Sequence, residues 1–341
     1  MHKKVRSRAP LRLGLAGGGT DVSPYSDEYG GAVLNATINM FSYCTISLNT
    51  DNKVFFNAQD LDISFESDPK LIELDGDLIL HKAIYNKVMT RFNNSQFLPI
   101  NVLTHCDAPV GSGLGSSSTV VVSILKAYQE LLNLPLGEYD LAHLAYDIER
   151  IDCRFSGGKQ DQYCASFGGL NFMEFYGDDR VIVNPLRVKS TILAELEAST
   201  LLFFTGVSRD SSNIIDDQVN ALENDKCLQG LHKVKDTAFS MKEAILKGDM
   251  VKFFSLQKEA WNAKKQTSKL ISNHQIEKIS SAVLSKGALA LKVSGAGGGG
   301  FMMIYCNPDI KRNITRVLEQ FNGKVYNLNF SQEGAKSWVV K

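Results

Sequence analysis

A glycine-rich loop that opens a helix is the feature of this chain with the clearest chemical meaning. The segment from Ala108 to Ser118 reads Ala-Pro-Val-Gly-Ser-Gly-Leu-Gly-Ser-Ser-Ser, and apolar residues at helical spacing follow it from Val121 onward. Backbone N–H groups at the start of a helix point together at the positive end of its dipole. The loop therefore predicts an anion site, most often for phosphate, where a serine hydroxyl can also reach a metal ion that the phosphates carry.

Two other glycine-rich motifs fit this loop poorly. A Walker A loop needs a lysine directly before its Ser or Thr, but the first lysine after the glycines is Lys126, inside the helix. A dinucleotide fingerprint would need glycine at position 116, which is Ser116. The earlier glycine run has Ala16 where its second glycine would belong. A serine-capped turn without a ligand remains the alternative to phosphate binding.

Composition narrows the class of protein. The chain has 341 residues, which suits two domains, and its 37 basic and 37 acidic residues give a formal net charge of zero. No nucleic-acid or membrane surface is indicated. The six cysteines are scattered without a Cys-x-x-Cys pair, which is typical of reduced thiols in a cytoplasmic protein. The six histidines show no metal-ligand spacing.

The hydrophobic pattern predicts strands first, with helices among them. We expect strands at residues 11–15, 32–37, 43–48, 53–56, 63–65, 100–104, 170–175, 181–183, 201–204, 288–293 and 301–305. Helices are expected at about 79–92, 117–133, 138–151, 211–223, 229–247 and 250–260. This order favours an α+β fold over regular βαβ units.

Four segments, in order along nearly the whole chain, resemble the motifs of the GHMP kinase family. Residues 108–118 resemble its Pro-x-x-x-Gly-Leu-Gly-Ser-Ser phosphate motif, and residues 9–21, 156–169 and 292–301 resemble its N-terminal, aspartate-bearing and C-terminal glycine motifs. The resemblance implies the two-domain GHMP kinase architecture. A ribosomal-protein-like N-terminal domain (1–188) would hold the ATP-binding loop and the catalytic aspartate. A ferredoxin-like C-terminal domain (189–341) would close the active site.

Phosphoryl transfer needs a phosphate cradle, charge neutralisation and a metal ion. By resemblance, Mg²⁺ would be bound by Ser117 and Glu149, although Glu149 could instead be a solvated carboxylate paired with Arg150 or Lys126. The ATP phosphates are expected to contact the loop at Pro109, Gly111, Ser112, Gly113, Leu114, Gly115, Ser116, Ser117 and Ser118.

Three residues are expected to carry the catalysis. Asp161 resembles the aspartate that contacts the acceptor hydroxyl, as a general base or by orienting it; an Asx turn is the alternative. Lys159 could offset developing charge or hold Asp161 ionised. Arg12 matches a basic position of the N-terminal motif and could stabilise the transferred group, or it could be a surface arginine at a strand edge.

Residues 16–21 indicate the acceptor. They read Ala-Gly-Gly-Gly-Thr-Asp where galactokinases and mevalonate kinases carry Gly-Glu-His, and they resemble the branch that acts on heptose 7-phosphate. The implied reaction is ATP-dependent phosphorylation of the anomeric C1 hydroxyl of D-glycero-D-manno-heptose 7-phosphate to the 1,7-bisphosphate, toward activated heptose for surface polysaccharide. We expect acceptor contacts at Gly18, Gly19, Thr20, Asp21, Arg209, Gly297 and Gly298.

A phosphorylated sugar also needs a site for its distal phosphate, which we expect at Arg154, Lys159 or Arg209. The expected partner is this small-molecule substrate, with a homodimer allowed for and no nucleic acid or membrane. Two alternatives stay open. One is a fucose or other hexose 1-kinase, and the other is a non-catalytic relative that binds nucleotide or sugar.

Overall fold

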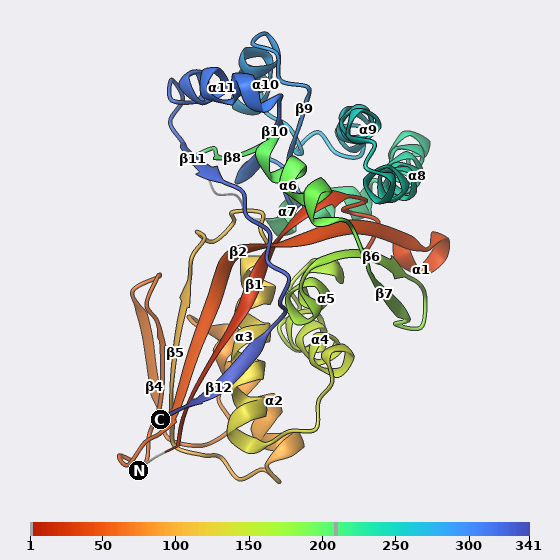
Figure 1. Ribbon diagram of the computed structural model, residues 1–341. Coiled ribbons are helices and arrows are strands. Elements are labelled where there is room, and N and C mark those ends of the chain that lie inside the picture. Colours follow the sequence, from red (N-terminus) through yellow and green to blue (C-terminus); the bar gives the residue numbers. More distant parts are fainter. Residues whose placement is uncertain (1–2, 208–210) are drawn as a thin grey trace.

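The computed structural model describes residues 3–207 and 211–341, whose strands form two sheets (Figure 1). The larger sheet has eight strands in the order β12-β1-β2-β5-β3-β4, with β6 and β7 added beside β2. Their bounds are β1 (Lys4–Ala16), β2 (Gly31–Leu48), β3 (Val54–Ala58), β4 (Ile63–Ser67), β5 (Ile100–Cys106), β6 (Leu170–Phe175), β7 (Val181–Pro185) and β12 (Lys336–Val340).

Strand β2 joins the two halves of this sheet. Its residues 31–36 pair with β6 and its residues 42–48 pair with β5, while β1 lies along its other edge. The sequence predicted two separate strands here, at 32–37 and 43–48; the structure has one strand of 18 residues that runs through the exposed Asn39. Register shifts in β1 between Pro10 and Arg12 and between Gly14 and Ala16 mark irregularities of the bulge type, which re-aim side chains near functional sites.

Four helices cover one face of the larger sheet (Figure 1). They are α2 (Ile79–Phe92), α3 (Ser116–Leu132), α4 (Glu138–Asp147) and α5 (Gln160–Phe167). The helices predicted at 79–92 and 117–133 are confirmed. The one predicted at 138–151 ends as α-helix at Asp147 and continues as a π-helical turn, η1 (Ile148–Asp152), which contains Glu149. Such turns are frequent at functional sites because they shift a side chain's direction.

The smaller sheet has the ferredoxin-like arrangement that the resemblance implied. Its strands are β8 (Thr200–Phe204), β9 (Ala290–Val293), β10 (Phe301–Tyr305) and β11 (Lys324–Asn327), all antiparallel in the order β11-β8-β10-β9. The remaining helices are α1 (Tyr25–Tyr29), α6 (Ser190–Ala198), α7 (Ser211–Asn220), α8 (Asp225–Lys247), α9 (Met250–Lys264), α10 (His274–Leu284), the 3₁₀ turn η2 (Pro308–Ile310) and α11 (Lys311–Leu318).

One hydrophobic cluster belongs to both sheets. Leu11 and Leu13 of β1 share it with Met241 of α8, Phe253 of α9 and Tyr305 of β10, and all five are buried. Burial of such side chains is worth roughly 1.5–3 kcal/mol each. The two units are therefore packed through a common core. Leu114 and Phe301, which adjoin the two glycine loops, belong to the same core.

The last strand returns to the first sheet. Strand β12 pairs with β1 from Lys4 opposite Val340 to Arg8 opposite Lys336, so the chain ends lie side by side (Figure 1). The expected boundary after residue 188 thus leaves one C-terminal element in the N-terminal sheet. No element was expected after residue 305, so η2, α11, β11 and β12 were all missed; for β12, a five-residue edge strand leaves little periodicity to detect. No helix in the described parts of the chain is long and apolar enough to cross a membrane.

Removing β12 should destabilise the whole molecule. A chain that stops after Ala335 loses the ladder of five residue pairs with β1. At about 1 kcal/mol for each ladder hydrogen bond, we expect a loss of several kcal/mol in the free energy of unfolding. Urea denaturation followed by far-UV circular dichroism measures it, with deletion of Lys341 alone as the control. An unchanged midpoint for the longer deletion would show that β12 contributes nothing to stability.

Candidate active site

The phosphate-motif loop leaves β5 at Cys106 and enters α3 at Ser116. Gly111, Gly113 and Gly115 have φ angles of 70°, 78° and 74°, a left-handed conformation that glycine adopts without strain. Successive N–H groups in such alternating backbone can form a concave anion site, and this loop lies at the N-terminal end of a 17-residue helix. The loop therefore has the backbone conformation that the predicted phosphate site needs.

The two glycine loops touch through their backbones. A Cβ atom on Gly113 would lie 2.5 Å from the Ser294 carbonyl oxygen, and one on Gly295 would lie 2.9 Å from the Gly113 Cα. The Phe301 N–H also donates to the Ser112 carbonyl at 2.8 Å. Only residues without a Cβ permit this approach, so the loops of the two units meet directly at the site.

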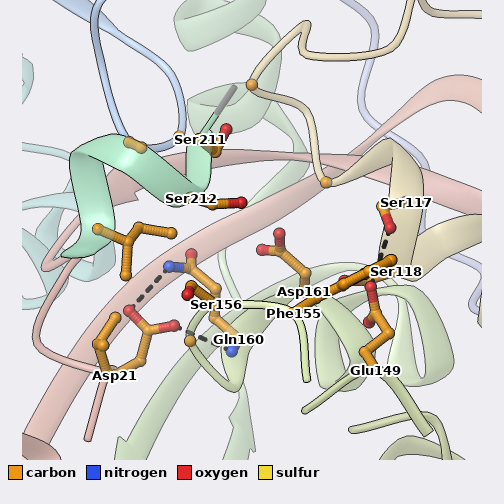
Figure 2. Close-up of a pocket in the computed structure, with 18 of the residues that line it drawn as sticks. Asp21, Ser117, Ser118, Glu149, Phe155, Ser156, Gln160, Asp161, Ser211 and Ser212 are labelled. Carbon is orange, nitrogen blue, oxygen red and sulfur yellow. Dashed lines mark hydrogen bonds between the residues drawn. The ribbon is translucent and has the colours of Figure 1, made fainter. Parts of the chain in front are cut away.

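A cavity of about 620 Å³ lies at this junction (Figure 2). It is lined by both glycine loops, by the segment around α5, and by α7 and α9 of the second unit. Of the expected site residues, those that line it are Arg12, Gly19, Asp21, Gly111, Gly113, Gly115, Ser116, Ser117, Ser118, Glu149 and Asp161.

Asp161 and Arg12 form the ion pair at the centre of the cavity. Asp161 lies in the first turn of α5, and its Oδ1 accepts from Arg12 Nε at 2.6 Å, with Arg12 Nη2 also at 2.6 Å. Arg12 Nη1 donates to the Gly113 carbonyl at 2.8 Å. The Asp161 side chain keeps 21% exposure against 5% for Arg12, so the carboxylate faces the cavity and the guanidinium holds it from behind.

Ser117 and Glu149 lie together on the phosphate side (Figure 2). Ser117 Oγ donates to Glu149 Oε1 at 3.0 Å, and Gln162 Nε2 donates to Glu149 Oε2 at 2.5 Å. The buried Glu149 also has Arg150 Nη1 at 3.8 Å from its Oε1. Ligands on adjacent vertices of a Mg²⁺ octahedron, with bonds of about 2.1 Å, lie about 3.0 Å apart. The spacing of the two oxygens fits Mg²⁺, although no cluster of three or more His, Cys, Asp or Glu side chains occurs in the described residues.

Asp21 and Gln160 form a second polar corner on the other side of Asp161 (Figure 2). Asp21 accepts from the N–H groups of Gly19 and Gln160, at 3.1 Å each, and from Gln160 Nε2 at 3.0 Å. Its carboxylate retains accepting capacity, and Gln160 Oε1 is buried without a partner in the described residues. This corner can accept hydrogen bonds from hydroxyl groups.

Lys159 does not lie beside Asp161, contrary to expectation. Its ammonium group is 3.5 Å from an Asp27 oxygen and 3.2 Å from an Asp179 oxygen, and it does not line the cavity. The cause is local, because Lys159 precedes α5 on the side facing α1, whereas Asp161 lies within the helix. Arg12 takes the position at Asp161 that Lys159 was expected to fill.

Several other expected contacts are also absent from the cavity wall. Gly297 and Gly298 pack against Ile271 instead, with the Gly298 N–H donating to the Ile271 carbonyl at 2.7 Å, while Gly295 and Ala296 line the cavity. Thr20 is buried and bonds Gly17 and Ala32. Expected residues that do not line the cavity are Pro109, Ser112, Leu114, Gly18 and Arg154. Arg209 lies outside the described residues.

Lys264 is one of the cavity residues that sequence reasoning missed, together with Arg150, Gln160, Ser211 and Ser212. It ends α9, is 4% exposed, and its Nζ donates to the Gly295 carbonyl at 2.6 Å. Burial lowers the pKa of Lys264 to about 8, with nearby Arg12 acting in the same direction and Asp21 opposing it. Nothing in the sequence separates Lys264 from the neighbouring Lys265, because only tertiary packing buries one of them.

The chain is similar to known sugar kinases over its whole length. Family models described as the N-terminal and C-terminal domains of GHMP kinases match residues 79–169 and 241–324. D-glycero-alpha-D-manno-heptose 7-phosphate kinase of Campylobacter jejuni is 45% identical over 99% of this chain and 100% of that protein.

Two solved structures share both fold and sequence with this chain. A D-glycero-D-manno-heptose 1-phosphate kinase from Bacteroides thetaiotaomicron is 43% identical, with a TM-score of 0.84 over 99% of each chain. A putative sugar kinase from Campylobacter jejuni is 44% identical, with a TM-score of 0.83 over 99% of this chain and 98% of that one. Sequence identity, fold and the paired glycine loops lead to the same conclusion: this chain belongs to the GHMP kinase family, the ATP-dependent phosphotransferases that act on hydroxyl groups.

Proposed function

We propose that this kinase transfers the γ-phosphoryl group of ATP to the anomeric C1 hydroxyl of D-glycero-D-manno-heptose 7-phosphate, which gives the 1,7-bisphosphate. The observation that carries the proposal is the Asp161–Arg12 pair, 2.6 Å apart between the glycine cradle and the Asp21–Gln160 corner. The heptose 7-phosphate kinase of Campylobacter jejuni, 45% identical, supports the choice of acceptor.

The cradle and the corner define two halves of the reaction. The N–H groups at Gly111, Gly113 and Gly115 bind the triphosphate, and the Asp21–Gln160 corner accepts hydrogen bonds from sugar hydroxyls. Ser117 and Glu149 are the residues that would hold Mg²⁺, which neutralises phosphate charge when bound. An acceptor hydroxyl placed between the two halves faces Asp161.

Asp161 and Arg12 then act on the acceptor. Asp161 accepts a hydrogen bond from the C1 hydroxyl and orients its oxygen toward the γ-phosphorus. It takes the hydroxyl proton as the new P–O bond forms and the bond from the γ-phosphorus to the bridging oxygen breaks, which releases ADP. Arg12 holds the Asp161 carboxylate in place. Because Arg12 also donates to the Gly113 carbonyl, it sets the distance between this carboxylate and the glycine loop. Its positive charge also lies where negative charge develops during transfer.

Replacing the carboxylate should separate chemistry from binding. We expect Asp161→Asn to lower kcat by roughly 100-fold or more, the usual contribution of a positioned base, while the affinity for ATP stays within a few fold. Steady-state kinetics and calorimetric titration with a non-hydrolysable ATP analogue measure the two quantities. Asp152→Asn, on the nearby π-helical turn and paired with Lys87, is the control. Near-normal turnover by Asp161→Asn would remove this residue from the mechanism.

The identity of the product tests the function itself. With Mg·ATP, we expect turnover on D-glycero-D-manno-heptose 7-phosphate, and ³¹P NMR of the product should show a second phosphorus coupled to the anomeric proton. The panel should include heptose 1-phosphate, mannose 6-phosphate, fucose, galactose and mevalonate. Turnover of heptose 1-phosphate instead would move the reaction to another hydroxyl, and preference for a free hexose such as fucose would overturn the acceptor. No turnover on any acceptor would support a non-catalytic binder.

A further inference from the structure

Three cationic side chains line the cavity within the described part of the chain: Arg12, Arg150 and Lys264. Arg12 is paired with Asp161 at 2.6 Å. Arg150 has Glu149 at 3.8 Å and donates to the Gly158 carbonyl at 3.3 Å. Both guanidinium groups therefore already face a carboxylate.

Lys264 differs from the two arginines. No carboxylate among residues 3–207 and 211–341 comes within 4.0 Å of its ammonium group, which donates to the neutral Gly295 carbonyl. An ammonium group has three donors, so two remain available. A buried lysine without a counter-charge is costly, and it is retained where a ligand supplies that charge.

The position of Lys264 indicates which ligand group it meets. A Cβ built on Gly18 would lie 3.7 Å from both Lys264 Nζ and Gln160 Nε2, and the charge of Asp21 acts on the pKa of Lys264, so the ammonium group lies near the Asp21–Gln160 corner. Ser211 and Ser212, at the start of α7, line the same cavity (Figure 2). Lys264 thus reaches this corner from the second unit, with Gly295 as its other neighbour, whereas Ser117 and Glu149 lie across Asp161 from the corner (Figure 2).

We propose that Lys264 binds the distal phosphate of a phosphorylated sugar and so selects sugar phosphates over free sugars as acceptors. The inference rests on the proposed function and replaces two of the three sites expected from sequence, since the third, Arg209, lies outside the described residues. Lys159 is neutralised by Asp27 and Asp179, and Arg154 does not line the cavity. A monoester phosphate carries close to two negative charges at neutral pH, which complements this uncompensated ammonium group.

The charges around Lys264 make its protonation depend on the ligand. Burial lowers the pKa of Lys264 to about 8; Asp21 opposes this shift and Arg12 adds to it. Behind it, burial together with Lys264 and Arg12 lowers the pKa of Lys292, which donates to the Gly14 carbonyl at 2.7 Å. Asp161, also at the cavity, is paired with Arg12. A bound phosphate dianion adds negative charge beside Lys264 and raises its pKa, so binding takes up a proton at alkaline pH.

Kinetics with two acceptors test the contact directly. For Lys264→Met we expect the KM for heptose 7-phosphate to rise roughly 10- to 100-fold, the range for losing a hydrogen bond to a charged group. The KM for ATP, and kcat/KM on the unphosphorylated heptose, should change less than about threefold. Lys264→Arg should recover part of the loss. Lys258→Met, exposed on the same helix, is the matched control.

Three results would each count against the proposal or its premise. An equal loss on the phosphorylated and free heptose, carried by kcat, would place Lys264 at the transferred phosphoryl group instead. An unchanged KM for heptose 7-phosphate would remove it from acceptor binding. Failure of the unmodified protein to phosphorylate heptose 7-phosphate would contradict the proposed function itself, before any variant is compared.

Proton uptake provides a readout that does not depend on turnover. Heptose 7-phosphate is titrated calorimetrically into the protein with a non-hydrolysable ATP analogue, in buffers of different ionisation enthalpy. We expect little proton uptake at pH 7 and clearly more at pH 9, because free Lys264 with a pKa of about 8 is mostly protonated at pH 7 and mostly neutral at pH 9. Lys264→Met should abolish the uptake at pH 9. The same uptake in that variant would show that another group titrates.

Discussion

The ion pair between Arg12 and Asp161 is the contact on which the site depends. It joins residues 149 positions apart and ties β1 to α5, while Arg12 Nη1 fastens the pair to Gly113 of the cradle. Because Arg12 and Asp161 lie at 5% and 21% exposure, removing either partner would leave a partly desolvated charge. Beside Arg12, strand β1 has a register shift of the bulge type. The side chain and the N–H of Arg12 both reach the glycine loop there, and the N–H donates to the Leu114 carbonyl.

Backbone contact between Gly113 and Gly295 imposes the second constraint. Since any Cβ at either position would meet the opposite backbone at 2.5 or 2.9 Å, both motifs must keep glycine for reasons of fit as well as of phosphate access. The two units also share the core that contains Leu13, Met241 and Tyr305, so they meet in this core as well as at the glycine loops. The glycine loop that we propose to bind phosphate therefore also takes part in the packing of the two units.

The predictable parts of this molecule are those with a local signal. Helix α2 has the predicted bounds, and Gly115, Ser117 and Asp161, which contiguous motifs singled out, line the cavity. The amphipathic helices α10 and α11 were nevertheless not predicted. Lys159 was placed wrongly because proximity in sequence does not fix direction across the start of α5. Strand β12 and Lys264 were missed because their partners, β1 and Gly295, lie far away along the chain.

The residues that the sequence revealed and those that it did not have different roles in the reaction that we propose. Cradle, metal ligands and Asp161 come from short motifs of the first unit, and they serve the transfer step that any acceptor shares. Lys264 comes from the second unit, at the end of an ordinary amphipathic helix, and its burial depends on how α9 packs beside Gly295. Acceptor choice can then change through single residues of that helix while the register of the motifs stays intact. The sequence motifs therefore indicate phosphoryl transfer. The proposed preference for a phosphorylated sugar rests instead on a lysine that has no carboxylate partner in the folded cavity.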